Sequence, residues 1–337
     1  YSEPEISKRA AAVTDKMLSM LALHTYKTGI VAPMGRVYRS VLYPFDQGAM
    51  ALMNLINPKL PYTFGEGWLG FYASSHYPIP EGLVKLMEDD VETNYTTGNA
   101  RVYLEKNDDY CLTSVASPRE PFTRWENETL KEDVDITTHN FTKSFNERFH
   151  GTTYFRPGTY GYQQHMWYAA LDGEASIFVT HPGSTSEEGD MRPGYWHGNG
   201  VMPALKQQHG LLGGIYVIPD EHPIGYTHLY CPECRFDEVI HEENWIFLRK
   251  ETGYLALWCS EKLEAHNGMN FNCEQRAYSK NAAYLCVCGG QKSDVSFATF
   301  KKRAKETSPS YDKESKTLTA QNFELSYVAC KDVTQFL

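Results

Sequence analysis

The sequence predicts an α+β protein in which a short N-terminal helical segment is followed by a large antiparallel β-sandwich. Two patterns support this fold class. Apolar residues follow helical spacing over about the first 85 residues, and short strand-like runs bounded by turn residues dominate after about residue 97. Aromatic residues make up 13% of the 337 residues, which suits all-β folds and carbohydrate sites alike. The predicted division is a helical part over 1–96 and a sandwich over 97–337.

The helical part contains three predicted helices. The first follows helical spacing from Ile6 to His24, and Gly29 is its expected end. A second is expected over 46–56 with Asp46 as its cap, and a shorter one over 67–75. These helices cannot enclose a core of their own, so they must pack on the sheet or belong to a larger helical unit.

The sandwich part is expected to hold many short strands and one late helix over 295–305. Residues 249–253 have the composition of a hairpin connection. The polar stretch 117–155 fits neither period and predicts a long loop or insertion. The strands are predicted at 100–105, 110–116, 176–181, 211–218, 226–230, 245–249, 254–259, 270–278, 283–288 and 324–330.

Composition excludes some classes of partner and cofactor. The net charge of -10 argues against a broad nucleic-acid surface, and no apolar run is long enough to span a membrane. Cys231 and Cys234 form one CxxC pair, which supplies only half of a tetrahedral zinc site. No cofactor is therefore expected. Three glycosylation sequons permit a secreted, extracellular or periplasmic glycoprotein, at Asn94, Asn127 and Asn140.

The run from Arg192 to Gly200 combines a guanidinium, two aromatic rings, an imidazole and a carboxamide. Its glycines and proline exclude a helix and disfavour a regular strand. Flat rings with polar edges and directed hydrogen-bond donors suit the binding of sugars and uronic acids. The side chains concerned are Arg192, Tyr195, Trp196, His197 and Asn199.

Histidines gather in the middle of the sequence, with nine of the 12 between His139 and His241. Strand alternation places Gln163 with His165, and Tyr226 with His228 and Tyr230. Imidazole is the usual general acid or base near neutral pH. Two other interpretations stay open. Each histidine could be satisfied by nearby backbone groups, or a divalent metal such as zinc or calcium could bind His222 and His228 with Asp237 or Glu238.

Several of these segments together resemble the C-terminal part of heparinase II/III-like proteins, which pair an α/α-toroid with an antiparallel β-sandwich. The resemblance covers about residues 30 to 330 in layout. Its best motifs are Gly161-Tyr-Gln-Gln-His165, His181-Pro-Gly183, Arg192-Pro-Gly-Tyr-Trp-His-Gly-Asn-Gly200, Tyr226-Thr-His-Leu-Tyr230 and Phe236-Asp-Glu. Members with known activity are polysaccharide lyases.

The resemblance implies β-elimination on a uronic-acid polysaccharide. Arg192 and Asn199 would neutralise the substrate carboxylate, and His165, His228 or Tyr160 would transfer the proton. The other expected contacts come from Tyr195 and Trp196 stacking on sugar rings and from Gln163, His197, His76 and Tyr77.

The implied partner is an acidic polysaccharide. Because most of a toroid is missing from this sequence, a further helical domain or partner chain is also expected. Two other functions stay open: a non-catalytic carbohydrate-binding or structural glycoprotein, and a glycoside hydrolase on the same scaffold. The hydrolase is disfavoured because paired carboxylates such as Glu242 and Glu243 are adjacent and therefore diverge.

Overall fold

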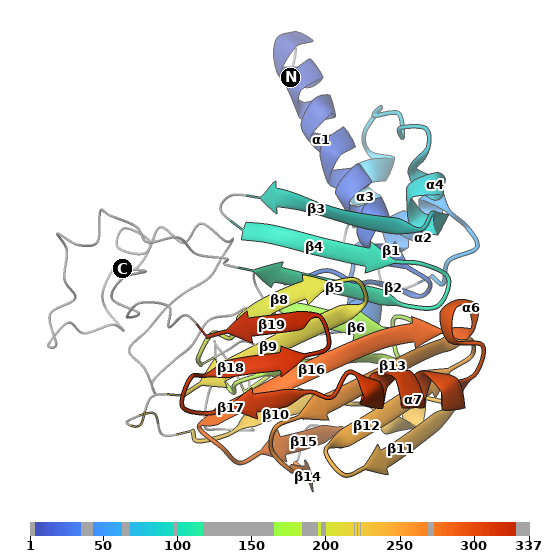
Figure 1. Cartoon of the computed structure of the whole chain (residues 1–337). Coiled ribbons are helices and arrows are strands. Elements are labelled where there is room, and N and C mark those ends of the chain that lie inside the picture. Colours follow the sequence, from blue (N-terminus) through green and yellow to red (C-terminus); the bar gives the residue numbers. More distant parts are fainter. Residues whose placement is uncertain are drawn as a thin grey trace, which may run out of the picture.

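The computed structural model of this chain is mostly antiparallel β-sheet with few helices (Figure 1). Every strand pairing among the described residues is antiparallel. None of the described helices combines the length and apolar character that a membrane crossing requires. The structure describes residues 4–34, 43–62, 68–97, 100–116, 165–183, 195–196, 200–218, 220, 222, 224–268 and 273–327.

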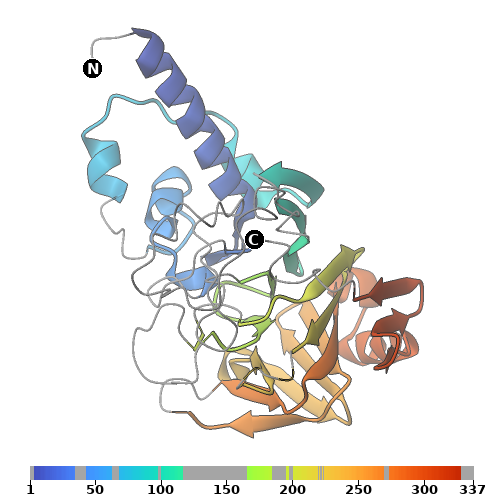
Figure 2. The same cartoon turned by 90° about the vertical axis from the view of Figure 1, so that its left-hand side faces the viewer.

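The N-terminal helices share one small apolar core. It includes Leu18 and Ala22 of the first helix, Met50 and Met53 of the second, and Leu83 of the fourth. Figure 2 shows these helices at one end of the molecule, with the first half of α1 projecting away from the strands. The helices are α1 Pro4–His24, α2 Met50–Ile56, α3 Trp68–Ala73 and α4 Leu83–Glu88.

The larger sheet has eight strands in the order β14-β15-β10-β7-β6-β5-β4-β3. Its central strands alternate between two faces, because successive side chains of a strand point to opposite sides. Their bounds are β3 Val91–Thr97, β4 Ala100–Lys106, β5 Cys111–Ala116, β6 Trp167–Ala170, β7 Ser176–Thr180, β10 Thr227–Tyr230, β14 Leu263–His266 and β15 Glu274–Ala277.

A second sheet has six strands in the order β11-β12-β13-β16-β9-β8. The hairpin predicted at 249–253 joins β12 to β13, where Lys250 pairs with Gly253. The bounds are β8 Ala204–Gln208, β9 Leu211–Val217, β11 Glu238–Glu242, β12 Trp245–Lys250, β13 Gly253–Cys259 and β16 Asn281–Gly290.

The two large sheets face each other across a shared apolar core. Leu112, Ile177 and Leu229 enter it from the larger sheet, and Leu257 and Tyr284 from the smaller. All five are at most 1% exposed, so this core is closed to water. Such a face-to-face arrangement buries the inner side of both sheets and leaves each outer side to be covered separately.

Both outer faces are covered by other parts of the chain. On the six-stranded sheet, Phe247 packs with Phe300 of helix α7 and Phe323 of strand β19. On the eight-stranded sheet, Phe178 and Tyr230 pack with Tyr26, Val31 and the aromatic pair 195–196. The covering elements of the first face are α6 Gln291–Asp294, α7 Phe297–Glu306, β17 Ser310–Asp312, β18 Thr317–Ala320 and β19 Phe323–Ser326.

Three expectations about the N-terminal part need correction. The second helix begins at Met50 with Ala49 as its cap, because Pro44–Asp46 form a separate 3-10 turn and Gln47 is extended. The first helix ends at His24, where β1 Thr25–Tyr26 turns back on β2 Gly29–Ile30. The eight-stranded sheet begins at Val91, before the predicted boundary. The predicted insertion over 117–155 lies outside the described residues.

Candidate functional site on the outer face of the large sheet

Four of the residues predicted to form the site meet on the outer face of the eight-stranded sheet. They are His165, Tyr195, Trp196 and His228, and they come from three separate segments of the chain. His165 is held just before β6 by a pair of backbone hydrogen bonds with Met34. The convergence of these segments is therefore built by tertiary contacts rather than by closeness in sequence.

Strand register decides which polar groups join them. In β10, His228 stands opposite Thr180 of β7 and Arg276 of β15, and Tyr230 stands opposite Glu274. Side chains directly opposite each other share one face of a sheet. This register gathers a hydroxyl, an imidazole, a carboxylate and a guanidinium on the outer face, beneath the segment that carries Trp196.

His228 is enclosed by its neighbours on the outer face, among them the ring of Tyr195 at a centroid distance of 4.8 Å. The indole of Trp196 stacks on its imidazole with ring centroids 3.9 Å apart and an interplanar angle of 12°. Its Nε2 lies 2.7 Å from Thr180 Oγ1, which makes a hydrogen bond. Its Nδ1 lies 3.4 Å from Glu274 Oε1, a distance suited to an electrostatic contact. The ring is 0% exposed, so all of its interactions are internal.

Glu274 is the charge centre of the site. Arg276 Nε donates to its Oε1 over 2.6 Å, and the Tyr195 hydroxyl donates to the same oxygen. Burial by itself would raise the pKa of Glu274. The interaction with His228, together with the hydrogen bonds from Arg276 and Tyr195, outweighs that effect and lowers the pKa of Glu274 to about 2. Glu274 is therefore a buried carboxylate at neutral pH.

Arg276 completes this network and links it to two phenols. Its Nη2 donates to Tyr195 Oη over 2.6 Å, and its guanidinium lies 4.5 Å from the ring centroid of Tyr226. The two tyrosine hydroxyls are 3.1 Å apart. Burial and the hydrogen bond to Glu274 raise the pKa of Tyr195, so this phenol stays neutral and acts as a donor. We call Thr180, Tyr195, Trp196, His228, Glu274 and Arg276 the outer-face network.

His165 secures the backbone of the same segment. Its Nε2 lies 2.6 Å from the carbonyl oxygen of Trp196, and its Nδ1 lies 2.7 Å from the Tyr168 hydroxyl. The ring also packs on Phe178 at a centroid distance of 4.4 Å. One histidine thus fixes the main chain at position 196 while another, His228, fixes the side chain.

A second pair of buried histidines lies next to this segment. The rings of His181 and His222 meet edge to face, 4.6 Å apart. The amide of Gly200 donates to the carbonyl of His181 over 3.0 Å, and a Cβ at Gly200 would lie 2.5 Å from His181 Nδ1. Only glycine allows this approach. The pKa of His181 is lowered to about 3, mainly by burial and to a smaller extent by the neighbouring His222.

Because the pKa of His181 is lowered in the folded protein, the free energy of unfolding should decrease as the pH falls. In the unfolded chain this histidine titrates near pH 6.5. Below that pH the unfolded state binds a proton that the folded state does not bind, and this favours unfolding. We expect about 2 kcal/mol of stability to be lost through His181 between pH 6.5 and pH 5. Urea unfolding of the wild type and of His181→Asn across this range should show a smaller pH slope in the variant. Equal slopes would contradict the assignment, and His241→Asn, at an exposed histidine, is the matched control.

The geometry holds charges in place but exposes none of them. Thr180, His228 and Glu274 follow the order hydroxyl, imidazole and carboxylate that activates a nucleophile in many enzymes. Yet the three residues are at most 3% exposed, so a polymer cannot reach them in this structure. The outer-face network also contains one carboxylate, whereas a glycosidase needs two across a bond. Its contacts hold Tyr195 and Trp196 against the outer face of the sheet.

The remaining predicted site residues lie elsewhere or outside the described residues. His76 is exposed and Tyr77 is half-buried; both line a groove beside α1, where the Tyr77 hydroxyl donates to Asp15. They belong to the helical end rather than to the outer-face network. Asn94 is exposed on β3. The residues outside the described ranges are Tyr160, Gln163, Arg192, His197, Asn199, Asn127 and Asn140.

The alternative metal site is not assembled by the described residues. Asp237 and Glu238 both contact Arg249, whereas His228 contacts Thr180 and Glu274. Within the described ranges no group of three or more histidine, cysteine or acidic residues is arranged to hold a metal ion.

Sequence reasoning missed three members of the network: Thr180, Glu274 and Arg276. A signal for two of them was available. Glu274 and Arg276 are two residues apart within the predicted strand 270–278, so their opposite charges are expected on the same face of the sheet. Which face they share depends on pairing with β10, a strand more than 40 residues earlier, and the sequence does not specify that pairing.

No protein-family model matches this chain, and no curated protein matches it significantly.

Proposed function

We propose that this chain is the β-sheet part of a polysaccharide lyase that cleaves a uronic-acid-containing glycan by β-elimination. The supporting observation is that His165, Tyr195, Trp196 and His228 converge on one sheet face from distant parts of the sequence. In this proposal the outer-face network anchors the run 192–200, whose Arg192 and Asn199 meet the substrate. The opposite wall of the site is a helical, toroid-like unit that extends the N-terminal helices.

The proposed reaction needs a base, a group that neutralises the carboxylate and a proton for the leaving group. Arg192 and Asn199 bind the uronate carboxylate, which makes the neighbouring C–H more acidic. A base removes that proton, the electron pair forms the new carbon–carbon double bond, and the glycosidic C–O bond breaks. The leaving oxygen then takes up a proton. Tyr160 is the proposed base, because His165 and His228 are both 0% exposed and act here as positioning residues.

The same burial supports a second candidate function. A buried polar network can stabilise a carbohydrate-binding loop without performing any chemistry. The chain would then be a non-catalytic glycan-binding protein in which Tyr195 and Trp196 shape the binding loop.

An assay on uronate polymers tests the proposal. We expect the protein to release unsaturated products that absorb in the ultraviolet from at least one of a polyuronate panel, such as polymannuronate, polygalacturonate and a glucuronate-containing glycosaminoglycan. Arg192→Ala should lower turnover by about 100-fold or more, because removing one preorganised charge-stabilising donor typically costs that much. The matched control is Arg235→Ala, which removes an exposed arginine that pairs with Glu174.

Other outcomes decide among the alternatives. Retained glycan binding with no unsaturated product from any polymer would establish the non-catalytic function. Reducing ends released without ultraviolet absorbance would indicate hydrolysis. A variant Arg192→Ala that loses its fold, judged by circular dichroism, would show that Arg192 is structural and would refute the role proposed for it.

A further inference from the structure

Helix α1 presents an apolar stripe to solvent. Of the seven large hydrophobic side chains that stand exposed among the described residues, three lie on this helix: Ile6 at 54%, Val13 at 59% and Met17 at 49%. None of residues 4–17 is buried, although the helix continues into the core of the N-terminal part through Leu18 and Ala22. An exposed stripe of this size on a soluble surface usually marks a binding site.

The spacing of the stripe is that of a helix–helix seam. Ile6, Ala10, Val13, Met17 and Met20 follow one another at intervals of four, three, four and three residues. This 3.5-residue repeat keeps a seam facing a second helix along its whole length, whereas a compact ligand needs no such repeat. At 1.5 Å per residue the stripe is about 20 Å long.

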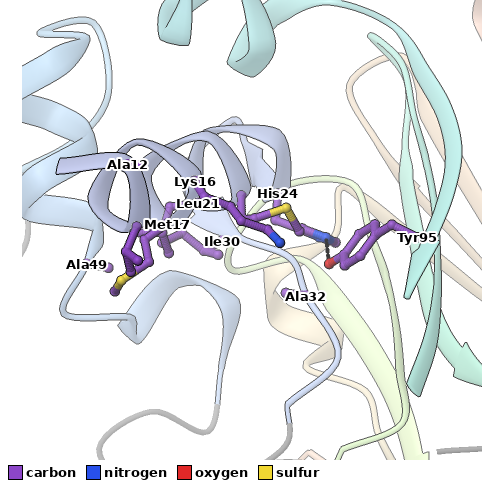
Figure 3. Close-up of a pocket in the computed structure, with 11 residues that line it drawn as sticks. Ala12, Lys16, Met17, Leu21, His24, Ile30, Ala32, Ala49 and Tyr95 are labelled. Atoms are coloured by element: carbon purple, nitrogen blue, oxygen red, sulfur yellow. Dashed lines mark hydrogen bonds between the residues drawn. The ribbon is translucent and has the colours of Figure 1, made fainter. Parts of the chain in front are cut away.

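The C-terminal half of the stripe lines a groove of about 560 Å³ (Figure 3). Val13, Met17 and Met20 form one wall, and Ile30, Ala32 and Ala49 lie across from them. The groove ends at the hydrogen bond between His24 Nε2 and Tyr95 Oη, 2.8 Å long. The two alanines on the far wall leave room for the side chains of a packed helix, so the groove continues the seam.

The charges beside the stripe specify the partner. Arg9 and Lys16 are exposed and lie seven residues apart along one edge of the seam, where flanking charges meet those of a partner helix. Arg9 also pairs with Glu5 over 3.0 Å, but this ion pair is exposed and therefore weak enough for an acidic partner residue to replace Glu5. Ser7 and Thr14 occupy the other edge and carry no charge. A second copy packed antiparallel would bring Arg9 and Lys16 of both copies together, and the like charges would oppose that dimer.

From the seam, the groove and these charges we infer that α1 is the docking site for an amphipathic helix with acidic residues along its apolar stripe. This goes beyond the proposed glycan chemistry. It specifies that the helical partner is acidic and that it docks on α1. It does not require the chain to be a lyase.

Two designed peptides test the inference on the full chain. Both carry leucine at the two seam positions of three heptads; one has glutamate and the other lysine at the flanking positions, so that like charges keep each peptide monomeric. Fluorescence anisotropy should show binding of the glutamate peptide and at least about tenfold weaker binding of the lysine peptide. The double variant Arg9→Glu/Lys16→Glu should reverse this preference, and Val13→Asp should abolish binding of both peptides.

Lys8→Glu is the matched control, because it makes the same charge change on the opposite side of α1 and should leave the preference unchanged. All of these positions are exposed, so circular dichroism should show an unchanged fold. Equal binding of both peptides, or binding of neither, would overturn the inference. So would a dimer of the chain in sedimentation that Val13→Asp dissolves, since a second copy would then occupy the seam. The lyase assay above is independent of all these results.

Discussion

Glu274→Gln should lower the free energy of unfolding by about 3–5 kcal/mol, the usual cost of removing one partner from a buried ion pair. The substitution preserves the shape of the side chain but removes the carboxylate charge that Glu274 places beside the guanidinium of Arg276, a residue only 7% exposed. Urea unfolding at neutral pH, followed by tryptophan fluorescence, measures the change. The matched control is Glu238→Gln, because Glu238 pairs with Arg249 at the surface and should contribute at most about 1 kcal/mol.

The pH dependence of this effect separates charge from packing. The pKa of Glu274 is lowered to about 2 in the folded protein, so its stabilisation is present above the unfolded pKa near 4.3 and is lost as the pH falls towards 2. The gap between wild type and Glu274→Gln should therefore close over that range. A pH-independent gap would mean that the carboxylate acts through packing alone, and a loss below 1 kcal/mol at neutral pH would contradict the ion-pair assignment.

Trp196→Ala should cost about 3–5 kcal/mol, the range for deleting a large buried aromatic side chain. The indole is 2% exposed, stacks on His228 and meets Phe178 and Tyr230 edge to face. Trp196→Phe keeps a ring over the imidazole and should lose distinctly less. Chemical denaturation measures both variants, and Tyr278→Ala, at a 56% exposed aromatic, should change stability by no more than about 0.5 kcal/mol.

The Trp196→Phe variant also tests whether the indole contributes to glycan binding. If the outer-face network positions the run 192–200, Trp196→Phe should remain folded and yet bind a uronate polymer more weakly than the wild type. Unchanged glycan affinity in Trp196→Phe would mean that the ring serves stability only.

The sequence predicted the central strands well and the edge strands poorly. The runs at 211–218, 245–249 and 254–259 correspond to β9, β12 and β13, because strands buried by the shared core carry a strong apolar signal. One central strand, β6, was also missed, because its four residues are all buried and form no alternating pattern. The strands β3, β8, β11 and β14 were missed as well. Each is the edge of one of the two large sheets and carries few buried side chains, so its apolar pattern is weak.

The candidate site was predicted in part for a related reason. Local composition identified Tyr195 and Trp196, and strand alternation placed His228 and Tyr230 together on the face where the structure has them. The acidic and hydroxyl partners depended on pairing between β7, β10 and β15, whose separation along the chain hides it from any local pattern. A tertiary pairing of this kind decides which charges become neighbours, and residue spacing alone cannot express it.

The buried charges at the pairing of β10 with β15 also disfavour a shifted register of these two strands. Glu274 and Arg276 share the outer face, whereas Gln275 and Ala277 point the other way. A slip of one residue would turn the carboxylate and the guanidinium towards the apolar interior, where neither would find its present partners. The buried charges therefore favour the observed alignment. A paired carboxylate and guanidinium give little advantage over apolar residues in the correct pairing, but the shifted pairing would bury both charges without these partners.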